Sequence, residues 1–322
     1  MSERVDVFGD GRAVLWQGDC LEVMHSMPDE SADLVFGSPP YEVARTYGID
    51  FDLRGQAWVD WMVECWREMR RVSRGVVAMV VEGQTRDFSW SATPALLMAD
   101  LKRAGFFLRK PPAFQRNGIP GSGGPDWLRN DYEFVVCTSK GRLPWSDNTA
   151  CGHPPKWGPG GAMSNRLSNG ARVNQWGGSA GKTRFGKKKD GSIDTNPRPS
   201  HRLERGNPKG SACSVPAIAN PGNVINCGSV GGGRMGDPLA HESEAPFPET
   251  LAEFFVRSFC PPDGVALDPF LGSGTTAAVA LKWGRRAMGI DIRQSQIDLT
   301  LRRLRKVADD APLFVGADEE TT

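Results

Sequence analysis

The feature that most constrains this chain is an alternation between apolar runs of strand length and segments whose apolar residues recur at helical spacing. The runs predict strands at 13–16, 32–36, 76–81, 132–138, 265–267 and 287–292. The helical spacing predicts helices at 21–27, 57–72, 95–104, 248–259 and 272–283, and a last helix that ends near Val307. Strands and helices that alternate in this way predict an α/β fold with a mostly parallel sheet.

The alternation is interrupted from 142 to 236, where glycine, proline, serine and asparagine replace the apolar pattern. The part from 151 to 236 carries thirteen lysines and arginines against three acidic residues, although the net charge of the chain is only +1. Because so long a structureless loop is rare in a compact domain, we expect a separate module or a segment that a partner orders. Five basic residues of this part are suited to DNA phosphate contacts, with a solvated loop as the alternative: Lys182, Arg184, Lys187, Lys188 and Lys189.

A glycine-rich turn follows the predicted strand 265–267, within the sequence LDPFLGSGTT that ends at Thr276. Glycines let the backbone approach a ligand closely, and the start of the next helix offers unpaired N–H groups to an anionic group. Seventeen residues after Gly274, Asp291 ends the next strand, close to the spacing at which an acid binds ribose hydroxyls in nucleotide-binding folds. We therefore expect an adenosyl ligand here, with a tight turn that binds nothing as the alternative.

A second motif, Ser38-Pro39-Pro40-Tyr41, directly follows the predicted strand 32–36. Ligands of open α/β sheets bind at the carboxyl ends of the strands, which is where this motif lies. Its two prolines stiffen the backbone and remove two N–H donors, so that carbonyl oxygens remain as acceptors beside an aromatic ring. The alternative is a proline-rich turn that only ends a strand.

With SPPY near the N-terminus and DPFLGSGTT near the C-terminus, the chain resembles the amino-methylating DNA methyltransferases of the permuted β group, in which the catalytic motif precedes the cofactor motif. The resemblance covers about residues 13–141 and 241–306. It implies a Rossmann-like methyltransferase fold with circularly permuted motif order, plus an irregular basic target-recognition region. It also implies double-stranded DNA as the partner, and leaves open whether a companion restriction endonuclease exists.

The resemblance further implies S-adenosyl-L-methionine as the cofactor. Gly18-Asp19 resembles the position that contacts the adenine of the cofactor, and the segment HESEAPFPETL from His241 resembles the one that packs on its methionine portion. The implied cofactor-binding residues are Asp19, Phe247, Pro248, Asp268, Pro269, Phe270, Gly272, Ser273, Gly274, Thr275, Thr276 and Asp291. The expected domains are a catalytic half at 1–141, a target-recognition region at 142–236, a cofactor-binding half at 237–308 and an acidic tail at 309–322.

The expected catalytic residues are Ser38, Pro39, Pro40 and Tyr41. An exocyclic amino group is a poor nucleophile because its lone pair is delocalised into the base. Acceptors such as the Ser38 hydroxyl oxygen and the Pro39 carbonyl can bind its hydrogens and stabilise the positive charge that develops during attack on a methyl sulfonium. The base must first be flipped out of the duplex, and Tyr41 can stack on it.

Serine in the first position of the motif favours cytosine N4 as the target, since in the family that the chain resembles DPPY is typical of the N6-adenine enzymes. Adenine N6, or an RNA substrate, remains the alternative. Methylation of cytosine C5 is disfavoured because it needs a Pro-Cys motif and the chain has Cys260-Pro261 instead. Protein glutamine methylases are also disfavoured, because they carry an NPPY motif after their cofactor motif, whereas SPPY precedes the cofactor motif in this chain. The remaining alternative is a nucleic-acid-binding protein without catalysis, and only the basic residues of 151–236 support it.

Other classes of protein are disfavoured by what the sequence lacks. The apolar runs are too short to span a membrane and no signal peptide is evident, so we expect a soluble intracellular protein. The resemblance implies a cytoplasmic protein of prokaryotic or phage origin that associates with DNA. Seven cysteines without a CxxC pair are not typical of a disulfide framework. We expect no metal site, because no common zinc spacing is present among Cys151, His153, His201, Cys213 and Cys227.

Overall fold

The computed structural model describes residues 2–42, 50–116, 124, 126, 128–154, 218–227 and 236–310. Backbone contacts divide the chain into two units, one that combines Met1–Cys151 with Gly222–Thr322 and one that spans Gly152–Pro221. Both boundaries fall inside the region 142–236, which was expected to form one irregular domain. Among the described residues, no helix has the length and apolar character that a membrane-spanning segment needs.

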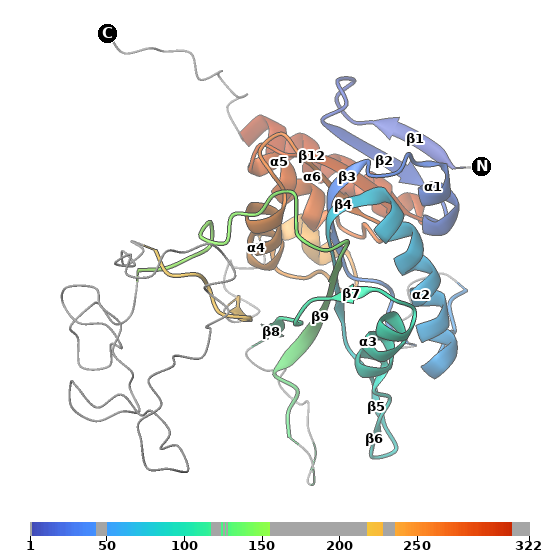
Figure 1. The fold of residues 1–322 in the computed structure, drawn as a ribbon. Coiled ribbons are helices and arrows are strands. Elements are labelled where there is room, and N and C mark those ends of the chain that lie inside the picture. The colour runs from blue at the N-terminus through green and yellow to red at the C-terminus, as the bar shows by residue number, and fades with distance from the viewer. Residues whose placement is uncertain are drawn as a thin grey trace, which may run out of the picture. The chain divides into compact units, whose positions relative to one another are not determined.

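A mixed sheet organises the larger unit (Figure 1). Its order over the described residues is β1-β2-β12-β11-β3-β4-β9-β8-β10, with β7 also paired to β9. Its strands are β1 (Glu3–Asp6), β2 (Ala13–Gln17), β3 (Ala32–Gly37), β4 (Ser73–Val81), β7 (Phe107–Leu108), β8 (Ala113–Gln115), β9 (Tyr132–Ser139), β10 (Val224–Asn226), β11 (Val265–Asp268) and β12 (Arg286–Asp291). The short strands β5 (Thr85–Arg86) and β6 (Ser89–Trp90) form a separate hairpin.

Helices cover both faces of this sheet. They are α1 (Cys20–Ser26), α2 (Gly55–Val72), α3 (Thr93–Arg103), α4 (Glu249–Phe259), α5 (Thr275–Lys282) and α6 (Gln294–Asp310), with a 3-10 helix η1 (Pro238–Glu242). Side chains of successive strand residues point to opposite faces. In β3, Leu34 and Phe36 therefore pack with α4, α5 and α6, whereas Val35 packs with α1, α2 and α3. Both faces are buried, which explains why the central strands are continuous apolar runs.

The strand order brings the two ends of the chain together. The five strands β2, β12, β11, β3 and β4 run parallel, and the C-terminal strands β11 and β12 lie between β2 and β3. Leu267 of β11 pairs with Val35 of β3, although 232 positions separate them in the sequence. The expected α/β fold with a mostly parallel sheet is confirmed. As a result, the SPPY motif and the glycine-rich turn leave the same edge of the sheet on neighbouring strands.

Several elements differ from the sequence expectation, and the strands β1, β5, β6, β7 and β8 were not expected at all. The helix expected from Gly272 begins only at Thr275, because Gly272 and Gly274 have positive φ angles of 50° and 74°, which are incompatible with a right-handed helix. The last helix continues to Asp310 instead of ending near Val307. The strand β10 lies inside the region expected to be irregular, where it pairs in parallel with β8. Three residues are too few for an alternating pattern to be recognised.

Candidate active site

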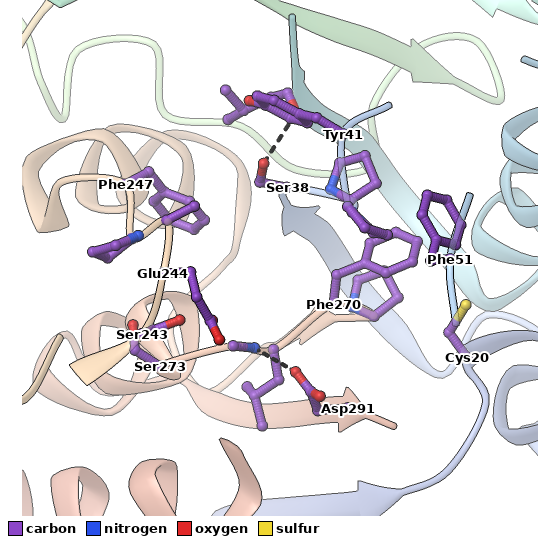
Figure 2. Close-up of a pocket in the computed structure, with 18 of the residues that line it drawn as sticks. Cys20, Ser38, Tyr41, Phe51, Ser243, Glu244, Phe247, Phe270, Ser273 and Asp291 are labelled. Atoms are coloured by element: carbon purple, nitrogen blue, oxygen red, sulfur yellow. Dashed lines mark hydrogen bonds between the residues drawn. The ribbon is translucent and has the colours of Figure 1, made fainter. Parts of the chain in front are cut away.

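A cavity of about 900 Å³ opens at the carboxyl edge of the central strands, where both motifs lie. Figure 2 shows Ser38 and Tyr41 at one end of it and Ser273 and Asp291 at the other, with Phe247 and Phe270 between. The predicted site residues that line it are Asp19, Ser38, Pro39, Pro40, Tyr41, Phe247, Pro248, Pro269, Phe270, Gly272, Ser273, Thr275 and Asp291. Asp268, Gly274 and Thr276 belong to the same turn but lie behind the cavity wall.

Hydrogen bonds orient the polar groups of the SPPY motif. The Ser38 hydroxyl donates to the Val80 carbonyl of β4 at 3.3 Å, which leaves the lone pairs of the hydroxyl oxygen available as acceptors (Figure 2). The Pro40 carbonyl accepts the indole N–H of Trp58, on α2, at 2.9 Å. Within the described part of the chain, the Pro39 carbonyl accepts no hydrogen bond. Two acceptors, Ser38 Oγ and the Pro39 carbonyl, are thus available at this end of the cavity.

Glu42 fixes the chain directly after the motif. Its side chain is buried and accepts hydrogen bonds from the Gly55 N–H at 2.5 Å, the Ser91 hydroxyl at 2.6 Å and the Thr93 hydroxyl at 3.2 Å. A buried carboxylate with three donors is stable only if all of them stay in place. Glu42 therefore couples the motif to the start of α2 and to the start of α3.

The glycine-rich turn is held from behind by side chains of α6. The Thr300 hydroxyl donates to the Gly272 carbonyl at 3.1 Å, and Arg303 Nη1 donates to the Ser273 carbonyl at 3.0 Å. Arg303 is fully buried and forms an ion pair with Glu249. The carbonyls of Gly272 and Ser273 therefore point toward α6, while both residues also line the cavity.

Three acidic residues predicted for the cofactor have defined partners. Asp291 accepts the Gly272 N–H at 2.8 Å and the Arg293 N–H at 2.9 Å, and burial raises its pKa against the effect of these two donors. Burial also raises the pKa of Asp268 to about 7. Asp19 caps α1, because its carboxylate accepts the N–H groups of the first turn. Of the three, Asp291 and Asp19 line the cavity.

Aromatic side chains form one wall of the cavity. The ring centroids of Phe51 and Trp61 are 5.0 Å apart, and those of Trp61 and Phe270 are 5.8 Å apart. All three rings line the cavity. Only Phe270 was expected from the sequence. Trp61 belongs to the apolar pattern of α2, and that pattern gives no sign that one of its rings reaches a ligand site.

Three charged residues at the Tyr41 end of the cavity were missed by the sequence analysis. They are Glu82, Arg116 and Glu133. Glu82 directly follows β4, and the rule that ligands bind at the carboxyl ends of parallel strands could have identified it. Glu133 could not be placed in this way, because it lies near the start of β9, and only the antiparallel pairing of β9 with β4 brings that end to the same edge. Burial raises the pKa of Glu82.

The predicted DNA-binding residues Lys182, Arg184, Lys187, Lys188 and Lys189 lie outside the described residues. Of the residues considered and rejected for zinc, Cys151, His153 and Cys227 are described, and His201 and Cys213 are not. In the described ranges, no group of three or more His, Cys, Asp or Glu side chains has an arrangement that could hold a metal ion.

Residues 32–302 match the model of a protein family described as DNA methylase, which covers N6- and N4-directed enzymes. A similar relative in sequence is the DNA adenine methyltransferase YhdJ of Escherichia coli K12. It is 24% identical over 302 residues, which cover 92% of this chain and 84% of the relative.

Two solved structures share the fold. The PvuII DNA methyltransferase, described as cytosine-N4-specific, gives a TM-score of 0.60 at 18% identity and covers 92% of this chain and 90% of its own. The TTHA0409 protein of Thermus thermophilus, solved as a complex with S-adenosyl-L-methionine, gives a TM-score of 0.51 at 22% identity. The match covers 90% of this chain and 92% of that one.

Proposed function

Because the chain belongs to the DNA methylase family, we propose that its cavity binds S-adenosyl-L-methionine at the Asp291 end and a flipped cytosine at the Ser38 end, and that it methylates the N4 amino group. The observation that carries this proposal is that a single cavity is lined by both motifs. Its volume of about 900 Å³ lies within the range of about 300–1,000 Å³ for small-molecule sites. The DNA is double-stranded in this proposal, as the resemblance implies.

The residues at the Asp291 end fit the cofactor. The Asp291 carboxylate, at the end of β12, is placed to accept the ribose hydroxyls, because each of its oxygens keeps a lone pair beside the backbone donor that it already binds. The rings of Phe51 and Phe270 offer faces for the adenine. The hydroxyl of Ser273 and the start of α5 suit the charged methionine portion. When bound, S-adenosyl-L-methionine supplies an electrophilic methyl group on a sulfonium.

The residues at the other end fit an amino group. Ser38 Oγ and the Pro39 carbonyl accept its two hydrogens, which favours a tetrahedral nitrogen and stabilises the positive charge that grows on it. The indole of Trp58 holds the Pro40 carbonyl, so the motif keeps its shape while the base enters. Tyr41 stacks on the base and helps to offset the cost of flipping, which is a few kcal/mol. The excess proton leaves the methylated nitrogen for water, and no covalent enzyme intermediate is needed.

Two observations favour cytosine N4. The first residue of the motif is serine, and the PvuII enzyme, which shares the fold, is described as cytosine-N4-specific. Adenine N6 is the second candidate, because the similar relative YhdJ is described as an adenine methyltransferase. The same two acceptors would serve either amine, so the chemistry at Ser38 does not separate the two targets.

Transfer of labelled methyl groups from S-adenosyl-L-methionine to DNA tests the proposal. We expect Ser38→Ala to lower the rate by a factor of about 100 or more, since an acceptor for the developing charge is lost, while cofactor binding stays within about twofold. Asp291→Ala should instead act mainly on the cofactor and weaken its binding. An unchanged transfer rate in both Ser38→Ala and Tyr41→Ala would exclude the mechanism.

A further inference from the structure

The Tyr41 hydroxyl, Arg116 and Glu133 form a polar cluster at the base end of the cavity, and the mechanism proposed for methyl transfer uses neither Arg116 nor Glu133. The Tyr41 hydroxyl donates to Glu133 Oε2 at 3.1 Å, and Arg116 Nη1 donates to Glu133 Oε1. Glu133 is only 5% exposed, yet all three residues line the cavity. A carboxylate this buried needs both donors, and in return it holds the guanidinium at the cavity wall.

Most donors of the guanidinium remain for a ligand. A guanidinium has five N–H groups in a planar fork, and the fork can donate two parallel hydrogen bonds to neighbouring acceptors. Among the described residues, Glu133 is the one side chain that accepts a hydrogen bond from Arg116. Phe114, two positions earlier in the sequence, also lines the cavity, so the Arg116 side of β8 is an inner wall of the site rather than an outer surface.

The two candidate bases differ at the edge next to their amino group. Cytosine has two acceptors there, N3 and O2, whereas adenine has one acceptor, N1, followed by a C–H group. A fork with two donors matches the cytosine edge, and against adenine one donor would be left without a partner. Sites that hydrogen-bond a polar group discriminate strongly against a ligand that lacks it.

We infer that Arg116, held by Glu133, binds the N3 and O2 edge of the flipped cytosine and so favours cytosine over adenine. This inference rests on the proposed function, because it presupposes that the amino group lies at Ser38. Arg116 is then a specificity-determining residue for the same reaction, and Glu133 is a positioning residue that acts through it and through Tyr41.

The test compares two target bases in a duplex that carries the recognition sequence of the wild-type enzyme. One duplex has cytosine at the target position and the other has 3-deazacytosine, which keeps the amino group but has C–H in place of N3. The wild-type enzyme should lose kcat/KM on the analogue by a factor of about 10 to 100. Arg116→Gln should lower kcat/KM on the cytosine duplex by a similar factor. For this variant, kcat/KM on the 3-deazacytosine duplex should be little lower than on the cytosine duplex. Arg129→Gln is the matched control, because Arg129 is half-exposed, pairs with Asp131 and does not line the cavity.

A merely structural role of Arg116 would lower stability and affect both duplexes equally. The inference is therefore overturned if 3-deazacytosine lowers kcat/KM by the same factor in Arg116→Gln as in the wild type, while N4-methylcytosine is the wild-type product. If the wild type methylates adenine instead, the proposed target base and this inference both fail. Should Arg116→Gln not fold, the double variant Arg116→Gln/Glu133→Gln, which keeps a neutral hydrogen-bonding pair, is compared in the same way.

Discussion

At the scale of single residues, the site depends on which backbone carbonyls already accept a hydrogen bond and which remain available as acceptors. The Pro40 carbonyl accepts the indole N–H of Trp58, and the Ser38 hydroxyl donates its hydrogen to the Val80 carbonyl. The SPPY motif was predicted as the catalytic site from its place after a strand and from its occurrence together with the glycine-rich turn, because the four residues alone could equally form a turn that ends a strand. The sequence could not predict Trp58 as the support of this motif, because the tryptophan is one of several aromatic residues in the pattern of α2.

Trp58→Phe should lower kcat while the affinity for the cofactor stays the same. The change keeps an aromatic side chain, although a smaller one, and removes the N–H that binds the Pro40 carbonyl at 2.9 Å; a lost buried hydrogen bond costs about 1–3 kcal/mol. Trp66→Phe on the same helix is the control, since it removes a similar bond, to Thr138 at 2.7 Å, far from the motif. Equal loss of kcat in both variants would show that Trp58 acts only through stability.

Asp268→Asn should make stability less dependent on pH. Burial raises the pKa of Asp268 to about 7 from an ordinary value of 3.8, so the folded state holds its proton more tightly than the unfolded state. The stability of the wild type therefore falls as the pH rises from about 4 to about 7, by at most roughly 4 kcal/mol, and then levels off. Urea unfolding at pH 5 and pH 8 measures this, with the exposed Asp60→Asn as control. A constant difference between wild type and Asp268→Asn at both pH values would refute it.

At the scale of elements, α6 determines the shape of the glycine-rich turn. Thr300 and Arg303 lie one turn apart on this helix and bind successive carbonyls of the turn. The space behind the turn is also restricted, because a Cβ on Gly274 would lie 2.5 Å from the side chain of Thr300. The sequence pattern predicted a strand, a turn and a helix here. It placed the helix start at Gly272, three residues too early, because a hydrophobic period does not reveal a positive φ.

Arg303→Met should destabilise the fold by about 3–5 kcal/mol and weaken cofactor binding, because it leaves the Glu249 carboxylate without its partner and releases the Ser273 carbonyl. Arg303→Lys should recover part of both properties. The neighbouring Arg302, which pairs with the exposed Glu242, serves as control, and Arg302→Met should change stability by less than about 1 kcal/mol. Thermal unfolding with and without S-adenosyl-L-methionine reports both effects. Normal cofactor affinity in a folded Arg303→Met variant would contradict the proposed role.

At the scale of the whole molecule, the site is assembled from segments that are far apart in the chain. Residues 32–41 and 265–276 meet only because β11 lies beside β3. Local patterns predict each strand but not its neighbours, so the order of the sheet was not predicted, and only the resemblance implied that the two motifs serve one site. The charged residues Arg116 and Glu133 were missed for the same reason, since their meeting depends on the pairing of β8 with β9.

Replacement of residues 155–217 by a short glycine-serine linker should abolish site-specific methylation and leave cofactor binding intact. The backbone of His153 pairs with that of Ala219, with N–H to carbonyl distances of 3.2 and 2.8 Å, so a few residues can join the two ends. The removed part contains the basic residues proposed to contact phosphates, so DNA binding should also lose most of its dependence on salt. Gel shifts over a salt series measure the salt dependence of DNA binding, and calorimetry measures the affinity for the cofactor. Unaltered site-specific methylation by the shortened protein would exclude target recognition by this region.

In the proposed reaction, a methyl group passes from the cofactor at one end of the cavity to cytosine N4 at the other end. The most direct measurement incubates DNA with the protein and S-adenosyl-L-methionine, digests the DNA to nucleosides and identifies the modified base by mass. We predict N4-methylcytosine with the wild-type protein and about 100-fold less of it, or lower still, with Ser38→Ala in the same incubation time. N6-methyladenine as the product would contradict the assigned target base, and the absence of any methylated nucleoside would contradict the account of the site as a whole.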